Sequence, residues 1–172
     1  MKNNKVLKIS LAGILIAVAT VGSMFSFPVF GSKCSPVQHM VNIIAAIFLG
    51  PLYGTGAAFI TSLLRNMFGL GSLLAFPGSM FGAFLAGIAY KKSKSITLTL
   101  IGEVFGTAIL GGLAAYPVAI AFMGKSAAEL AFYAYIIPFL VSTAGGAVIA
   151  GVIIFSLQKS GVLTKMQERI NK

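Results

Sequence analysis

The chain has 172 residues, of which 58% are hydrophobic and 9% are charged, and its mean hydropathy is +0.96. A soluble domain carries about a quarter charged residues, so the polar side chains here are too few to cover a water-facing surface, which excludes the soluble classes of protein. A formal net charge of +10 would suggest nucleic-acid binding in a soluble protein. Here the basic residues flank apolar runs, so they indicate membrane topology, and we expect no nucleic-acid partner.

Six apolar runs predict an all-α integral membrane protein, a bundle of six transmembrane helices in a single domain over residues 1–172. A bilayer core is about 30 Å thick, and a helix needs about 20 apolar residues to cross it. The predicted helices lie at about residues 6–27, 37–52, 53–68, 73–90, 96–122 and 131–157. The first run could pass for a signal peptide, but no clear cleavage site follows it, and we expect it to be retained.

The second and third runs are short and are divided by the sequence GPLYG at Gly50–Gly54. A proline beside two glycines is a strong helix-breaking signal, and it predicts a tight turn between two short helices. One longer helix through Pro51, giving five segments, is the alternative. Six segments place ten of the 13 basic residues on one side, with both termini: Lys2, Lys5, Lys8, Lys91, Lys92, Lys94, Lys159, Lys165, Arg169 and Lys172.

This bias predicts that both termini are cytoplasmic and that the protein is a multi-pass protein of the cell membrane. The stretch GSKCSPVQHMVN (Gly31–Asn42) and the stretch Arg65–Ser79 then face outside. The tail Gly161–Lys172 is expected to be a short amphipathic end, solvated at the cytoplasmic surface.

Small residues recur at helical spacing on several of the predicted helices. In lipid, such stripes let helix backbones approach closely. Internal packing is the expected role of Gly78, Gly82 and Ala86, of Gly102 and Gly106, and of Ala147 and Gly151. The stripe on the first helix either packs internally or faces a partner protein in the membrane, and it consists of Ser10, Gly13, Ala17 and Thr20.

Enzyme motifs are incomplete throughout the chain. The sequence MGKS ends like a phosphate-binding loop, but Ala119 stands where the leading glycine is required. GLGSLL begins like a dinucleotide loop, but Leu74 replaces its third glycine. With one histidine, one cysteine and no aspartate, the chain cannot form a His-Glu metal-binding motif or a pair of aspartates. We therefore expect neither a cofactor nor a metal in this chain, and no enzymatic activity.

The outer end of the second predicted helix carries a cluster of polar side chains. Gln38 and Asn42 are four residues apart and His39 and Asn42 are three apart, so they share or nearly share one helix face. Together they offer donors and acceptors suited to a neutral heteroaromatic ligand. A hydrated interfacial histidine is the alternative interpretation of His39.

Further polar and aromatic side chains are expected near the same outer end. Snorkelling to the interface is the alternative for the arginine among them, and an aromatic belt is the alternative for the tyrosines. A largely apolar pocket with a few placed polar groups is typical of a small-molecule site. The added candidate substrate-binding residues are Arg65, Asn66, Ser72, Phe76, Ser79, Tyr116 and Tyr133.

Glu103 is an ionisable residue inside the fifth predicted helix, nearer its cytoplasmic end. A charged group at this depth faces a cavity or a partner rather than lipid. It is expected to be a ligand or proton site or, alternatively, a structural tether between helices. No chain of charges crosses the membrane, as a proton-driven pump often needs, so a partner must supply the energy for uphill transport.

The stretches GSKCSPVQHMVNIIAAIFLGPLYG (Gly31–Gly54) and LLRNMFGLGSLLAFPGSMFGAFLAG (Leu63–Gly87) resemble the ThiW family, the membrane substrate-binding (S) components of energy-coupling factor (ECF) transporters. The resemblance implies a six-helix S-component fold. It also implies capture of a thiamine precursor, hydroxyethylthiazole, from outside. The implied partners are a transmembrane coupling subunit and two cytoplasmic ATPases, which use ATP. It further implies that small residues of the first helix dock on the coupling subunit; Ser10, Gly13, Ala17 and Thr20 match in type.

Hydroxyethylthiazole has about nine heavy atoms, so at about −1.5 kcal/mol each its binding free energy cannot exceed about −13 kcal/mol. Nanomolar capture, at about −12 kcal/mol, therefore requires near-complete enclosure, and the loop Pro28–Pro36 is the predicted lid. The alternatives are an S component for thiamine or hydroxymethylpyrimidine, a stand-alone facilitator, an intramembrane enzyme acting through Cys34 and His39, and a purely structural membrane subunit.

Overall fold

The computed structural model describes residues 2–30 and 32–171. Met1, Gly31 and Lys172 lie outside the described residues; Gly31 belongs to the expected lid loop and Lys172 to the expected basic end. In chain order the elements are α1 (Lys2–Gly22), η1 (Ser23–Phe25), β1 (Phe27–Val29), β2 (Ser32–Cys34), α2 (Pro36–Met67), α3 (Ala75–Ser93), α4 (Ile96–Phe105), η2 (Gly106–Gly111), α5 (Gly112–Met123), α6 (Ile136–Lys159) and α7 (Val162–Asn171).

The chain is an all-α membrane protein apart from one short hairpin, and the six expected helices are α1, the two halves of α2, α3, the continuous α4–η2–α5 stretch and α6. Within the described residues, four helical stretches are long and apolar enough to cross a membrane. These are Lys5–Phe25, Pro36–Met67, Ile96–Met123 and Ile136–Lys159. Helix α3 is less apolar because it ends in Lys91 and Lys92.

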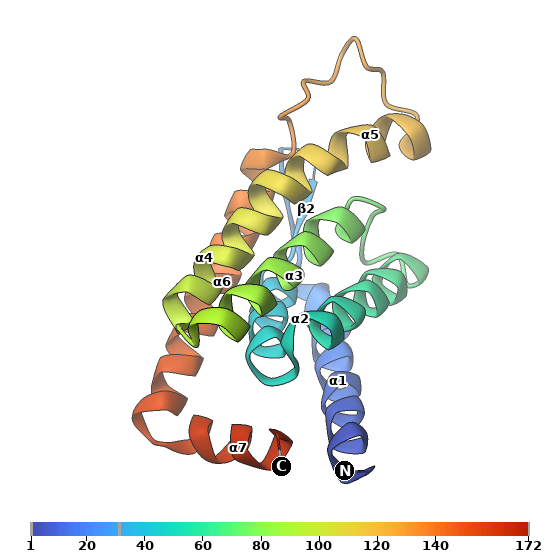
Figure 1. Cartoon of the computed structure of the whole chain (residues 1–172). Helices are drawn as coiled ribbons and strands as arrows, with labels where there is room; N and C mark the ends of the chain where they lie inside the picture. The colour runs from blue at the N-terminus through green and yellow to red at the C-terminus, as the bar shows by residue number, and fades with distance from the viewer. Residues whose placement is uncertain (1, 31, 172) are drawn as a thin grey trace.

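Helix α2 is interrupted at Gly50, as the GPLYG sequence predicts. Gly50 has φ of 79° and ψ of −176°, a conformation that glycine adopts at no steric cost. The chain reverses there, so that the second half of α2 returns beside the first (Figure 1), and a Cβ on Gly54 would lie 3.6 Å from the Ala45 backbone. The alternative of a single helix through Pro51 is wrong.

Two helix boundaries differ most from the prediction. The apolar run from Ala131 begins with turns, since the Ala134 and Ile136 amides donate to carbonyls three residues earlier, and α6 starts only at Ile136. Helix α1 ends at Gly22 and is followed by the short 3₁₀ turn η1. Both differences have one cause: apolar side chains continue beyond the helix ends into connections, where hydropathy alone cannot place the last turn.

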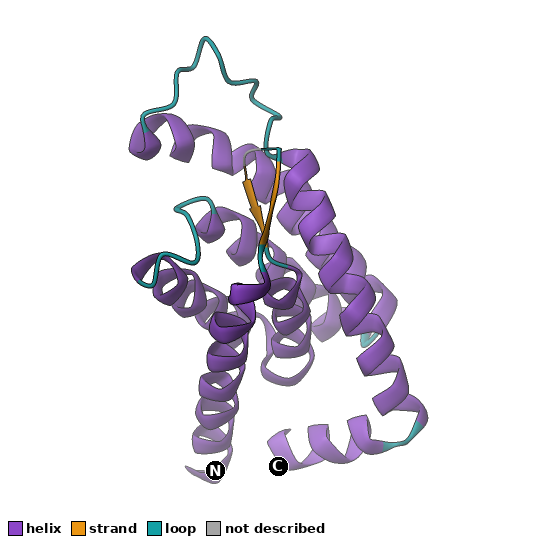
Figure 2. Cartoon of the chain, turned by 180° about the vertical axis from the view of Figure 1, so that it is seen from behind, coloured by secondary structure: helices purple, strands orange, loops and turns teal. Residues whose placement is uncertain are grey.

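The two ends of the bundle differ in character. Both termini lie at one end, while the β1–β2 hairpin and the connection from α5 to α6 lie at the other (Figures 1 and 2). The hairpin pairs Phe27 with Cys34 and Val29 with Ser32 in antiparallel register. It occupies the stretch expected to form a loop, Pro28–Pro36.

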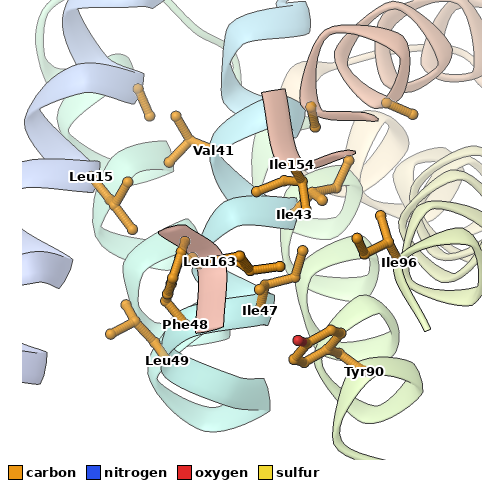
Figure 3. Packing of buried hydrophobic residues seen from close by; sticks show 14 of the residues in the cluster. Leu15, Val41, Ile43, Ile47, Phe48, Leu49, Tyr90, Ile96, Ile154 and Leu163 are labelled. Carbon is orange, nitrogen blue, oxygen red and sulfur yellow. The ribbon is translucent and has the colours of Figure 1, made fainter. Parts of the chain in front are cut away.

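The main hydrophobic core lies toward the end that holds the termini. Figure 3 shows Leu15 of α1, Ile47 and Phe48 of α2 and Tyr90 of α3 meeting with Ile154 of α6. The small-residue stripes of the fourth and fifth predicted helices pack internally, as expected. A Cβ on Gly106 would lie 2.6 Å from the Phe81 carbonyl oxygen, so α3 and η2 touch through their backbones.

Helix α7 corrects the expectation of a solvated tail. Leu163 and Ile170 are only 4% and 5% exposed and belong to the main core. The Gln167 side chain donates to the Tyr90 hydroxyl at 2.6 Å and to the Ile47 carbonyl at 3.4 Å. The amphipathic pattern of the tail therefore reflects packing across the end of the bundle.

Candidate functional site

The carboxylate of Glu103 is the centre of a buried polar network. Its Oε1 lies 2.9 Å from His39 Nδ1, and it accepts from Asn42 Nδ2 at 3.0 Å and from Thr107 Oγ1 at 3.3 Å. Glu103 is 0% exposed. A charged group at this depth is tolerated when such partners surround it, and the structural-tether interpretation describes this arrangement well.

The first half of α2 explains how His39 reaches Glu103. Pro36–Leu49 contains about 14 residues and rises about 21 Å, less than the thickness of a bilayer core. The first turn of α2, which holds His39, can therefore lie below the membrane surface. Glu103 lies at the same depth, in a helix that begins at the opposite end of the bundle. The wider π-helical turn η2 begins three residues after Glu103 and carries Thr107. π-Turns within α-helices often occur at functional sites.

A second group of hydrogen bonds fixes the neighbouring side chains. Gln38 Nε2 donates to Ser79 Oγ at 2.7 Å and to Ser62 Oγ at 3.2 Å. Asn42 Nδ2 donates to the carbonyl and hydroxyl oxygens of Ser79, both at 3.2 Å. The donors of Asn42 are thus used within the protein, which gives this side chain a positioning role.

A small cavity of about 30 Å³ adjoins this network at the hairpin end. Small-molecule sites occupy about 300–1,000 Å³, so a ligand enters here only if the elements of the wall move apart. Elements from both halves of the chain contribute to its wall. The lining residues are Ser32, Lys33, Ser35, Gln38, His39, Arg65, Ser72, Leu74, Ala75, Gly78, Ser79, Thr107, Phe139 and Ser142.

The hairpin forms part of this wall, and three contacts hold it together with Ser35, the residue that follows it. Lys33 Nζ donates to the Gly69 carbonyl at 3.1 Å, the Ser35 amide donates to Ser142 Oγ at 2.8 Å, and the Cys34 thiol donates to the Pro138 carbonyl at 3.2 Å. Burial raises the pKa of the Cys34 thiol above its ordinary value of 9.0. A buried, protonated thiol is a poor nucleophile, which disfavours the intramembrane-enzyme alternative.

The cavity wall includes Gln38, His39, Arg65, Ser72 and Ser79 of the predicted site residues. Asn42 and Glu103 do not line it, and they contact residues that do. Asn66 donates to the backbone carbonyls of Ser62 and Ser72 instead.

The predicted aromatic residues lie elsewhere. Phe76 packs against Phe59, with ring centroids 5.5 Å apart, and Tyr133 is 56% exposed beside Phe132. Neither these two nor Tyr116 of α5 is among the lining residues. These aromatic residues therefore lie outside the cavity wall. For Phe76 and Tyr116, the rotation of the helix about its axis decides which face the ring occupies, whereas Tyr133 lies in the turns before α6.

Phe139 of α6 is the aromatic ring that does line the cavity, and sequence reasoning missed it. The chain contains 14 phenylalanines, so nothing in its composition marks this one. The structure shows why the ring fits here: a Cβ at Gly78 would lie 2.8 Å from Phe139 Cε2, so only glycine at this position leaves room for it. Thr107 and Ser142 were also missed, although Thr107 follows Glu103 by one helical turn.

The small-residue stripe of α1 divides between two environments. Ser10, Gly13 and Ala17 are exposed, and a Cβ on Gly13 would meet nothing within 4 Å. Thr20, by contrast, is buried and donates to the Ile16 carbonyl at 2.8 Å. Thr20 is thus removed from the expected docking face, and the other three remain available to a partner.

The site combines hydrogen-bond donors, acceptors and a cation around a small cavity, which suits recognition rather than bond making or breaking. In the part of the chain that the structure describes, no three histidine, cysteine or acidic side chains come together to hold a metal.

Comparisons with known proteins agree with this picture. The family model of the thiamine-precursor transporter protein ThiW matches residues 9–160. The chain matches no curated protein. It is similar to a solved structure described as the S component of a bacterial ECF transporter, with a TM-score of 0.74 and 17% identity, over 90% of this chain and 97% of that one. The chain therefore belongs to the ThiW family of thiamine-precursor transporter proteins, and its fold is that of an ECF-transporter S component.

Proposed function

We propose that the protein is the substrate-capture subunit of an ECF transporter and that it takes a thiazole-class thiamine precursor, with hydroxyethylthiazole as the reference ligand, from outside the cell. The observation that carries this proposal is the cavity beside the Glu103 network, in a chain of a thiamine-precursor transporter family. The cavity opens at the hairpin end, and the basic residues favour that end as the outer one.

Glu103 and His39 give the proposed recognition its chemical basis. If His39 Nδ1–H donates to the carboxylate, the other ring nitrogen remains to meet the ligand, since a carboxylate behind a histidine sets its tautomer and orientation. Neutral His39 then accepts from the hydroxyl of the alcohol, and protonated His39 donates to the thiazole nitrogen. Gln38, Ser72 and Ser79 add further polar contacts, and Phe139 offers an aromatic face.

The β1–β2 hairpin is the proposed lid. A ligand of about nine heavy atoms must be almost fully enclosed to bind at nanomolar concentration. The hairpin supplies Ser32 and Lys33 to the wall, and its contact from Lys33 to the Gly69 carbonyl joins it to the α2–α3 connection.

Energy coupling is proposed to come from partners. The exposed residues Ser10, Gly13 and Ala17 of α1 are a surface on which a transmembrane coupling subunit can approach closely. Two cytoplasmic ATPases would then use ATP. A stand-alone facilitator remains the rival: uptake into liposomes by the purified protein without those subunits would favour it.

Titration calorimetry on the purified protein tests the substrate. We expect hydroxyethylthiazole to bind more tightly than hydroxymethylpyrimidine or thiamine, and His39→Gln to weaken binding at least tenfold. A clear preference for the pyrimidine or for thiamine would refute the thiazole assignment. Mass spectrometry of small molecules that co-purify with the protein provides an independent check.

A further inference from the structure

We propose that Arg65 makes the cavity selective for a heteroaromatic ligand whose side chain ends in an oxyanion, a carboxylate or a phosphate ester. This inference rests on the proposed capture of a thiazole-class precursor and specifies which form of it binds best.

Arg65 lies in the last turn of α2, lines the cavity and is only 3% exposed. Its Nε has no hydrogen-bond partner among residues 2–30 and 32–171. Within those residues the one ion pair is His39 with Glu103. The guanidinium is therefore a buried cation that the described protein does not neutralise.

The sequence itself limits the available counter-ions, because it contains only three acidic side chains. Glu103 is bound to His39 and Asn42. Glu129 is exposed in the α5–α6 connection, and Glu168 is exposed in α7 at the other end of the bundle. None of the three pairs with Arg65.

The usual accommodations of a membrane arginine do not account for this one. A snorkelling arginine keeps its charged head in water, whereas Arg65 is almost fully covered. A helix C-terminus favours a cation, but that effect is small beside the cost of a buried charge without a partner. An uncompensated buried charge facing a cavity is best explained by a ligand of opposite charge.

The surroundings select an oxyanion rather than a neutral acceptor. Lys33 adds a second cation to the wall, while Glu103, the nearest carboxylate in the network, does not line the cavity. A guanidinium presents parallel N–H groups that match a carboxylate or phosphate in a bidentate manner. A hydroxyl group would satisfy one donor and leave the charge unbalanced.

The test compares three thiazoles that share one ring: the alcohol 4-methyl-5-(2-hydroxyethyl)thiazole, its phosphate ester, and the acetic acid in which a carboxylate replaces the alcohol carbon. We expect at least one oxyanion to bind the wild-type protein at least tenfold more tightly than the alcohol. Arg65→Gln should abolish this preference, because it should lower the affinity for the oxyanions at least tenfold more than the affinity for the alcohol. Arg65→Lys, which keeps the positive charge but lacks the parallel N–H groups of the guanidinium, should retain part of the preference for the oxyanion.

A ligand-free measurement keeps the proposal testable if no thiazole binds. Because no described side chain neutralises Arg65, Arg65→Gln should leave the thermal unfolding midpoint of the purified protein unchanged or raise it. The control is Arg169→Gln, the other arginine of the chain, which is exposed in α7.

The two proposals fail in different ways. Tighter binding of the alcohol than of both oxyanions, or an equal loss for all three ligands in Arg65→Gln, would overturn the oxyanion inference and leave thiazole capture intact. A midpoint well below that of Arg169→Gln would also overturn it, since it would show that Arg65 has a structural partner. Failure of all thiazoles to bind would refute the proposed substrate, and the midpoint would then decide the role of Arg65.

Discussion

Replacing Glu103 with glutamine tests whether the buried carboxylate positions His39 for ligand binding. Glutamine has the same shape, so its carbonyl oxygen can still accept from His39, Asn42 and Thr107, which now contact Oε1. Its amino group takes the place of Oε2, which has no partner among the described residues. The substitution thus removes the charge and keeps the packing.

The magnitude follows from the two shorter contacts, at 2.9 and 3.0 Å. A hydrogen bond to a charged acceptor contributes about 1.5–3 kcal/mol and a neutral one about 0.5–1.5 kcal/mol, so each loses about 1 kcal/mol. The group at the Oε2 position has no partner either as a carboxylate oxygen or as an amino group, so its burial costs a similar free energy in both proteins. We therefore expect about 2 kcal/mol of destabilisation, or about 4–8 °C in the unfolding midpoint. Affinity for the thiazole ligand should fall about tenfold, because His39 loses its charged acceptor.

The chain itself supplies the stability assay. It has no tryptophan and one cysteine, and Cys34 is buried, so a thiol-reactive dye reports unfolding directly. Calorimetry measures ligand affinity in the same preparation. Glu129→Gln is the matched control, since Glu129 is exposed and does not line the cavity. Unchanged stability and unchanged affinity in Glu103→Gln would refute the positioning role.

Three further predictions follow from packing. Gly82→Ala should destabilise the protein and weaken ligand binding, because its Cβ would lie 2.8 Å from Oε1 of the buried Glu103. Gly56→Ala is the control: its Cβ would meet nothing within 4 Å, so stability in the dye assay and affinity in calorimetry should both stay unchanged. Alkylation of Cys34 should be slow at pH 8 and remain slow above pH 9, since burial raises the pKa of the thiol. The protonated thiol contributes its full stability below the ordinary pKa of 9.0. That contribution is lost as the pH rises through the higher pKa of the folded protein. Rapid labelling of folded protein would contradict this. Leu163→Ala should cost about 2–5 kcal/mol, and Val162→Ala, exposed in the same helix, much less; equal midpoints would show that α7 does not pack on the core.

The sequence by itself determined the membrane class, the number of helices and the break at Gly50. These are local properties: hydropathy over about 20 residues decides whether a segment prefers lipid, and glycine and proline decide where a helix ends. It also placed Gln38, His39 and Arg65 near one end of the bundle, because depth in a membrane follows from position along a helix.

Only the tertiary structure decided which polar groups meet. Glu103 was expected apart from the outer cluster, yet its Oε1 lies 2.9 Å from Nδ1 of His39, 64 residues earlier, because the first half of α2 is short. Asn42 shares the helix face of Gln38, and both side chains donate within the protein, yet only Gln38 lines the cavity. The rotation of each helix about its axis sets such pairings, and it depends on contacts with every neighbouring helix. Hydropathy reports how deep a residue lies, and the packed structure decides which way it faces.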